Sequence, residues 1–269
     1  MKKLLFIVNP KAGLKKNRNY IDEAVQVFEE AGYKVGIKYT KKRLDGTNIA
    51  REHGARVDLV VCMGGDGTLN EVIQGMAEKE ITTPLGYIPA GSTNDFAASL
   101  GLSSNPKTQA EFIVSHEAKP LDMGMFNGRY FVYTASAGIF TETSYSTPQK
   151  MKNRLGHFAY ILHGSRELFR IRSLKLKIEL EHTTHEGKYI FAAINNATKV
   201  GGIMKLDKEA VEFNDGEFEL MLVEFPKNPV EFIRLAVKIF TQQFTGKITL
   251  EKIKSARITD CTDIDLSLI

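Results

Sequence analysis

Cysteine is scarce in this chain, which carries two among 269 residues. Cys62 lies inside an apolar run and Cys261 near the end of the sequence, so we expect two free thiols and no disulfide framework. Long apolar runs are also missing, since none approaches the roughly 20 residues that a membrane-spanning helix needs. The sequence therefore predicts neither a disulfide-stabilised secreted protein nor a transmembrane segment.

Three further features are absent from the sequence. The apolar run at residues 4–8 follows two lysines but is too short for a secretory leader, because Asn9 and Pro10 end it. The six histidines show no metal-ligand spacing, and there is no internal repeat or low-complexity tract. We therefore expect a cytosolic protein without a histidine metal site.

The composition is that of an ordinary globular protein, with 43% hydrophobic and 25% charged residues. A chain of this length forms one large or two ordinary domains. The net charge of +4 is mild and permits attraction to nucleotides, anionic lipid surfaces or nucleic acid without choosing among them.

The first part of the chain alternates between strand and helix patterns. Such alternation predicts a parallel sheet with helices on both faces, here assigned to a domain of residues 1–121. The expected strands are 3–8, 34–39, 59–63 and 85–88, and the expected helices are 20–31, 47–53 and 69–76.

Past residue 121 the apolar residues recur with period two, which predicts a second, mostly antiparallel β domain of residues 122–269. Helical patterns at 148–172 and 229–244 interrupt it. The first of these helices is basic and amphipathic, which is typical of a half-buried helix but also of contact with an anionic bilayer.

A glycine loop, Gly64-Gly65-Asp66-Gly67-Thr68, separates an expected strand from an expected helix. The start of a helix presents unpaired N–H groups, which suit a phosphate. Asp66 would repel a bare phosphate, so its presence indicates a metal ion or a proton transfer. The alternative is a tight turn in which Asp66 caps the helix.

Two other strand ends carry similar loops. Residues 89–97 read Pro-Ala-Gly-Ser-Thr-Asn-Asp-Phe-Ala, and residues 9–13 read Asn-Pro-Lys-Ala-Gly. In open α/β sheets the ligand crevice lies beyond the carboxyl ends of the strands, where these loops and Thr40 are expected to meet.

Together these motifs resemble the catalytic domain of diacylglycerol kinases, and in particular bacterial lipid kinases related to diacylglycerol and sphingosine kinases. The resemblance covers residues 3 to about 225. It implies a fold like that of NAD kinases and phosphofructokinases, ATP and Mg²⁺ as cofactors, and transfer of the γ-phosphoryl group to a lipid hydroxyl, with diacylglycerol as the leading substrate. It implies no nucleic-acid partner. A lipid substrate at the membrane surface and a homodimer are both consistent with it.

The resemblance also implies site residues. Asp66 and Asp95 are the expected catalytic acids, although Asp95 is also placed to cap a short helix. The expected ATP-binding residues are Asn9, Pro10, Lys11, Ala12, Gly13, Thr40, Gly65, Asp66, Gly67, Thr68, Leu69, Asn70, Glu71 and Ser92.

A further segment, Asn214-Asp215-Gly216-Glu217-Phe218, is similar to the family's metal segment. On that analogy Asp215 supplies a carboxylate to Mg²⁺, and Glu212 and Glu217 supply further oxygen ligands. The alternative is an ordinary turn, which Asp-Gly between strands usually forms.

The end of the sequence departs from the resembling kinases, which carry an Asp-Gly-Glu segment there that is thought to supply a general base. Either Asp263 or Asp265 substitutes for it, or the chain as given is shortened or altered and is deficient in proton removal. Two alternative functions stay open: an NAD kinase, against which the loop at 89–97 argues, and a nucleotide-binding regulatory protein without turnover.

Overall fold

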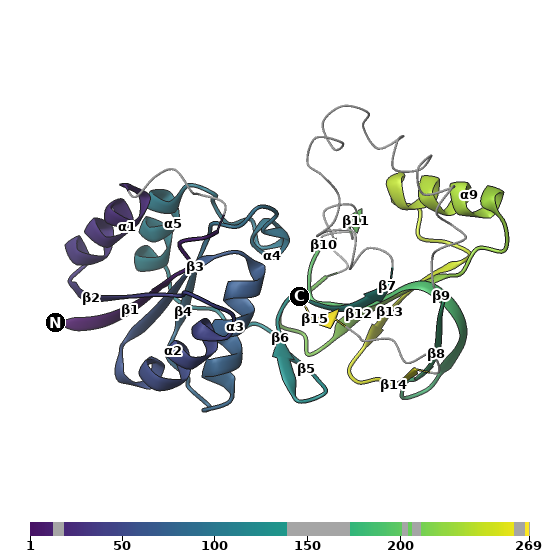
Figure 1. Cartoon of the computed structure of the whole chain (residues 1–269), viewed down its shortest axis with the longest axis horizontal. Helices are drawn as coiled ribbons and strands as arrows, with labels where there is room; N and C mark the ends of the chain where they lie inside the picture. Colours follow the sequence, from purple (N-terminus) through teal and green to yellow (C-terminus); the bar gives the residue numbers. More distant parts are fainter. Residues whose placement is uncertain (13–18, 139–172, 201–203, 206–210, 261–266, 269) are drawn as a thin grey trace. The chain divides into compact units, whose positions relative to one another are not determined.

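The computed structural model describes residues 1–12, 19–138, 173–200, 204–205, 211–260 and 267–268 (Figure 1). The chain divides into two compact units, Met1–Tyr133 and Thr134–Leu268. No helix in the described ranges combines the length and the apolarity needed to cross a bilayer.

The first unit is built on a parallel sheet with the strand order β2-β1-β3-β4. The apolar residues of β1 and all of β3 are buried, as expected for central strands that are covered on both faces. The strands are β1 (Lys2–Val8), β2 (Tyr33–Tyr39), β3 (Leu59–Gly64) and β4 (Leu85–Pro89).

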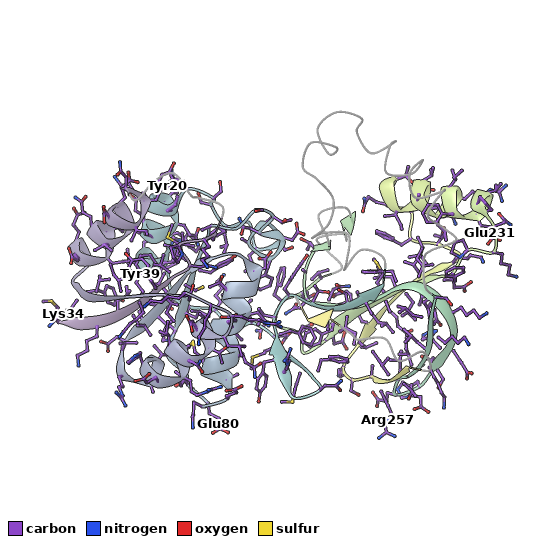
Figure 2. The ribbon with its side chains drawn as sticks, viewed as in Figure 1. Tyr20, Lys34, Tyr39, Glu80, Glu231 and Arg257 are labelled. Atoms are coloured by element: carbon purple, nitrogen blue, oxygen red, sulfur yellow. The ribbon has the colours of Figure 1, made fainter. Side chains whose placement is uncertain are left out.

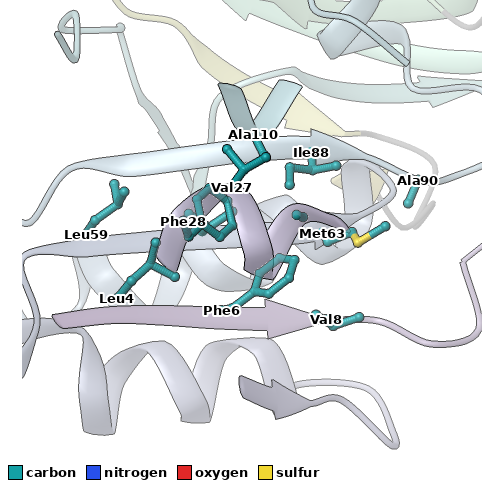
Figure 3. Close-up of a cluster of buried hydrophobic side chains, with 12 residues drawn as sticks. Leu4, Phe6, Val8, Val27, Phe28, Leu59, Met63, Ile88, Ala90 and Ala110 are labelled. Atoms are coloured by element: carbon teal, nitrogen blue, oxygen red, sulfur yellow. The ribbon is translucent and has the colours of Figure 1, made fainter. Parts of the chain in front are cut away.

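Helices cover both faces of this sheet. On one face α1 and α5 pack together over a core in which the rings of Phe6 and Phe28 meet edge to face at 5.6 Å (Figure 3). On the other face α2 and α3 pack together. The helices are α1 (Asn19–Glu30), α2 (Asp45–His53), α3 (Asp66–Ala77), α4 (Asp95–Ser99) and α5 (Pro106–Ser115), with a 3-10 turn at Gly54–Arg56.

The second unit is an antiparallel sheet with the order β13-β12-β9-β7-β15, and β8 joins β9 to β14. Its strands are β7 (Thr134–Gly138), β8 (Leu174–Glu179), β9 (Thr184–Asn195), β12 (Phe218–Glu224), β13 (Ile248–Ile253), β14 (Arg257–Asp260) and β15 (Ser267–Leu268). The short strands β10 (Lys199–Val200) and β11 (Met204–Lys205) form a separate pair.

One helix, α9 (Pro229–Phe240), packs against this second sheet through Phe232, Leu235 and Ile239. The carboxylate of Glu231, labelled in Figure 2, accepts a hydrogen bond from Lys247 Nζ at 3.1 Å and so secures its first turn. The predicted end at 244 is not reached, because Gln242 has a φ of 57° that a helix does not permit.

The expected fold class is confirmed: a parallel α/β unit followed by an antiparallel β unit. The expected helix at 148–172 lies outside the described residues. The sequence gives no apolar period for α5, yet its start carries a recognisable signal, since Asn105 Oδ1 accepts from the Thr108 amide and Pro106 follows at the first helical position.

The division between the units falls after Tyr133, whereas the change of period in the sequence placed it after residue 121. The intervening segment forms a hairpin of β5 (Gly124–Phe126) and β6 (Arg129–Phe131). The Tyr130 amide donates to Gln74 Oε1 on α3 at 2.7 Å. The period-two pattern therefore begins in a hairpin that is bound to the first unit.

Candidate active site

The carboxyl ends of the four parallel strands meet at one edge of the first sheet. Val8 lies in register with Tyr39 on one side and Met63 on the other, and Gly64 lies in register with Pro89. The chain crosses over β1 on its way from β2 to β3, so the strand order reverses between β1 and β3. In open α/β sheets this reversal point is where ligands bind.

The loop after β1 spans this reversal point. Asn9 donates from its amide to Met63 O at 2.9 Å and from Nδ2 to Thr68 Oγ1 at 2.9 Å, while its Oδ1 accepts from the Lys11 amide. Pro10 and Lys11 are exposed. The loop is thus attached to the start of α3, and Gly13 lies outside the described residues.

The glycine loop opens directly into α3. Gly65 caps the helix in an extended conformation, and its carbonyl accepts from the amides of Thr68 and Leu69. Within the described part of the chain the amides of Asp66 and Gly67 donate to no protein group, so they suit a phosphate oxygen. The alternative in which Asp66 caps the helix is wrong, because Gly65 is the cap and no side chain caps this helix.

The next residues of α3 differ in what they can offer a nucleotide. Leu69 and Thr68 are both buried. Asn70 Oδ1 is buried and has no hydrogen-bond partner within the described residues. Thr40, at the end of β2, is buried and donates from its amide to Val8 O.

Glu71, expected to contact ATP, holds the start of α2 in this structure. Its carboxylate accepts from the Leu44 amide at 2.8 Å and from the Gly46 amide at 3.1 Å. Leu44 has a φ of 69° and offers no side-chain cap to α2, so Glu71 supplies the missing acceptor.

Replacing Glu71 with alanine is expected to lower the free energy of unfolding by about 1–3 kcal/mol, because two amides lose a charged acceptor. Urea unfolding of Glu71→Ala measures this loss. The matched control is Glu111→Ala, at an exposed position of α5 where the side chain makes no hydrogen bond to a described group. Equal midpoints for the two variants would contradict the capping role.

The loop after β4 touches the glycine loop directly. A Cβ on Gly91 would lie 2.6 Å from Gly65 Cα, so the two backbones leave no room for a side chain. Asn94, in the left-handed conformation with a φ of 52°, accepts from the Gly91 amide and donates to the Gly91 carbonyl. Ser92 is exposed at the tip of this loop.

The two expected catalytic acids lie together at this junction. Asp66 Oδ2 accepts from the Asp95 amide at 3.0 Å, and Tyr133 donates its hydroxyl to Asp95 Oδ2 at 3.2 Å. On the other side of Asp66, the Tyr87 hydroxyl lies 3.2 Å from Gly64 O and 3.5 Å from Asp66 Oδ1. We call Asp66 and Asp95 the acid pair.

Burial, with a smaller contribution from the Asp95 carboxylate, raises the pKa of Asp66 to about 6. The amides of Asp95 and Phe96 and the Tyr87 hydroxyl oppose this by stabilising the ionised form. Burial also raises the pKa of Tyr87, which therefore stays a hydrogen-bond donor at neutral pH. An acid that titrates near neutrality is suited to accept a proton during a reaction.

Comparison with known proteins places this geometry in a family. The pattern of the family described as "Diacylglycerol kinase catalytic domain" matches residues 3–126. A diacylglycerol kinase of Bacillus subtilis (strain 168) is 37% identical over 238 residues, covering 88% of this chain and 78% of that protein. The chain belongs to the diacylglycerol kinase family.

Other members of the diacylglycerol kinase family match nearly the whole chain. A diacylglycerol kinase of Staphylococcus aureus (strain bovine RF122 / ET3-1) is 32% identical over 270 residues, covering 99% of this chain and 85% of that protein. The crystal structure of a diacylglycerol kinase from Bacillus anthracis str. Sterne superposes with a TM-score of 0.75 at 27% identity, covering 99% of this chain and 88% of that one. As a member of this family, the chain is a lipid kinase.

The expected metal segment of this diacylglycerol kinase family member carries a lysine on its central carboxylate. Lys252 Nζ lies 2.7 Å from Asp215 Oδ2, and Lys254 Nζ lies 4.0 Å from Glu217. Within the described ranges no three acidic, histidine or cysteine side chains form a metal-binding group, and Asp215 is paired with Lys252. The assignment of Glu212, Asp215 and Glu217 stays a prediction.

Asp263 and Asp265 lie outside the described residues, so the structure assigns them no place. Two tyrosines of the site, Tyr87 and Tyr133, were not predicted from the sequence. The available signal for Tyr87 is its position two residues before Pro89, inside a strand whose other large residues are aliphatic.

Proposed function

We propose that this lipid kinase uses ATP, delivered as its Mg²⁺ complex, to phosphorylate diacylglycerol at the inner face of the cytoplasmic membrane. The observation that carries the proposal is the contact between the loops after β3 and β4, which brings the acid pair together beside the start of α3. Phosphoryl transfer to an alcohol needs two kinds of group: groups that bind the phosphates, and a group with a pKa near 7 that accepts the hydroxyl proton.

The first kind of group binds the phosphates of ATP. The amides of Asp66 and Gly67 at the start of α3 would bind phosphate oxygens, with Asn9 and the exposed Lys11 on the neighbouring loop. Nucleotide contact would extend over residues 9–12, Thr40, 65–71 and Ser92. Since Glu71 already holds α2, its contribution there is to position this loop.

The second kind of group acts on the hydroxyl of the lipid. In the proposed reaction the lipid oxygen forms a bond to the γ-phosphorus as the bond from that phosphorus to the β-phosphate bridging oxygen breaks, which releases ADP. Asp66, ionised at pH 7 with a pKa of about 6, accepts the hydroxyl proton. Asp95 orients the hydroxyl from the other side of the pair.

Transfer of label from γ-³²P-ATP tests the proposal. With dioleoylglycerol in mixed micelles and Mg²⁺ present, label is expected in phosphatidic acid, and chelation of Mg²⁺ with EDTA is expected to abolish it. NAD and a mixture of monosaccharides serve as competing acceptors. Label in NADP would instead support an NAD kinase, and no transfer to any acceptor would overturn the proposal.

A further inference from the structure

Tyr133 lies where the chain leaves the first unit. It occupies the bend between β6 and β7, and the second unit begins at the next residue, Thr134. Its side chain turns back into the first unit, where only 5% of the residue is exposed. A buried tyrosine hydroxyl requires a hydrogen-bond partner, and Tyr133 finds one in the Asp95 carboxylate.

The hydrogen bond from Tyr133 constrains the side chain of Asp95. Asp95 is the first residue of α4, which has only five residues, and a helix this short is weakly determined by its own hydrogen bonds. The Asp95 backbone is fixed at two points, since its amide donates to Asp66 Oδ2 and its carbonyl accepts from Ser99 Oγ. Both of these bonds are made by the Asp95 backbone, whereas the Tyr133 hydroxyl donates to the Asp95 carboxylate.

The ring of Tyr133 has a separate packing role. It lies against Phe96 with the ring centroids 6.2 Å apart and the planes tilted by 52°. Phenylalanine at this position would keep the ring contact and lose only the hydroxyl. Packing and hydrogen bonding can therefore be separated by one substitution.

We infer that Tyr133 is a positioning residue for the transfer reaction. Its hydroxyl holds the Asp95 carboxylate in the orientation that receives the lipid hydroxyl, and it does so from the residue that joins the two units. The inference rests on the proposed phosphorylation of a lipid, because it assigns Asp95 to the acceptor.

The test compares Tyr133→Phe with Tyr130→Phe, in the full chain, using dioleoylglycerol micelles and ATP. Tyr130 is a matched control from the same segment, because its bond to Gln74 is made by the backbone amide and its hydroxyl has no partner within the described residues. Tyr133→Phe is expected to lower kcat roughly 10- to 100-fold, the effect of losing a hydrogen bond to a charged group. The KM for ATP and the ATP-induced shift in melting temperature are expected to stay at wild-type values.

A third variant, Tyr133→Leu, removes the ring as well. If Tyr133 only packs, Tyr133→Leu loses stability while Tyr133→Phe keeps the wild-type kcat, and the inference is overturned. A fall in kcat already present in Tyr133→Phe, with unchanged KM for ATP, supports it. Absence of lipid phosphorylation by the wild-type chain overturns the proposed function together with this role, whereas equal kcat for wild type and Tyr133→Phe overturns the role alone.

Discussion

Replacing Asp66 with asparagine is expected to stabilise the protein at pH 8 while lowering its turnover by a factor on the order of 10² to 10⁴, because the proposed proton acceptor is lost. The pKa of this carboxyl is about 6 in the folded chain against 3.8 for the free group. Between these values the folded state binds more protons than the unfolded state, so the free energy of unfolding falls as the pH rises. Well above pH 6 the full cost, on the order of 3 kcal/mol, is present.

Asparagine has the shape of Asp66 and cannot ionise, and its oxygen can still accept from the Asp95 amide. The melting temperature of Asp66→Asn, measured without nucleotide or metal, should therefore exceed that of the wild type at pH 8 and equal it near pH 4. The matched control is Asp22→Asn, at an exposed position of α1, which should show no such gain. A lower melting temperature for Asp66→Asn at pH 8 would mean that the fold stabilises this carboxylate.

Gly91→Ala is expected to lower turnover by about 10²-fold or more, because it forces the two catalytic loops apart. The new methyl group would lie 2.6 Å from Gly65 Cα and 2.7 Å from Asn94 Oδ1. The contacted atom of Gly65 belongs to the backbone and cannot rotate away from the methyl group. The Asn94 side chain is held by two hydrogen bonds. The separation would disturb the amides proposed to bind phosphate and the acid pair together.

Turnover and the ATP-induced shift in melting temperature measure this effect, and both should fall. Gly36→Ala in β2 is the control, since a Cβ there meets nothing nearer than Leu4 O at 3.7 Å. Wild-type turnover in Gly91→Ala would show that the loops can separate without consequence for the reaction.

The sequence predicts this site well where the site depends on the sheet. The apolar runs of β1 and β3 identify central parallel strands, and parallel strands place their carboxyl ends at one edge. The sequence therefore predicts that the loops after Val8, Gly64 and Pro89 meet. Residues that act within one loop, above all Gly65 and Asp66, can also be predicted, because they are neighbours in the sequence.

The rest of the site depends on pairs that are distant in the chain. The partner of Asp66 lies 29 positions further on, and Asp95 and Tyr133 are 38 positions apart. The family resemblance made Glu71 an expected nucleotide contact, yet its carboxylate accepts from the start of α2, 25 positions earlier. Such assignments require knowledge of which helices are neighbours, and periodicity along one helix does not provide it.

Helix α3 makes side-chain contacts along most of its length, through Asp66, Thr68, Glu71 and Gln74. These residues bind, in turn, α4, the loop after β1, the start of α2 and the hairpin strand β6. Surface loops ordinarily open on their own at little cost, whereas segments bound to one buried element exchange their amide protons together with it. We therefore expect the loops of the candidate site to exchange their amide protons together with α3, as one cooperative unit.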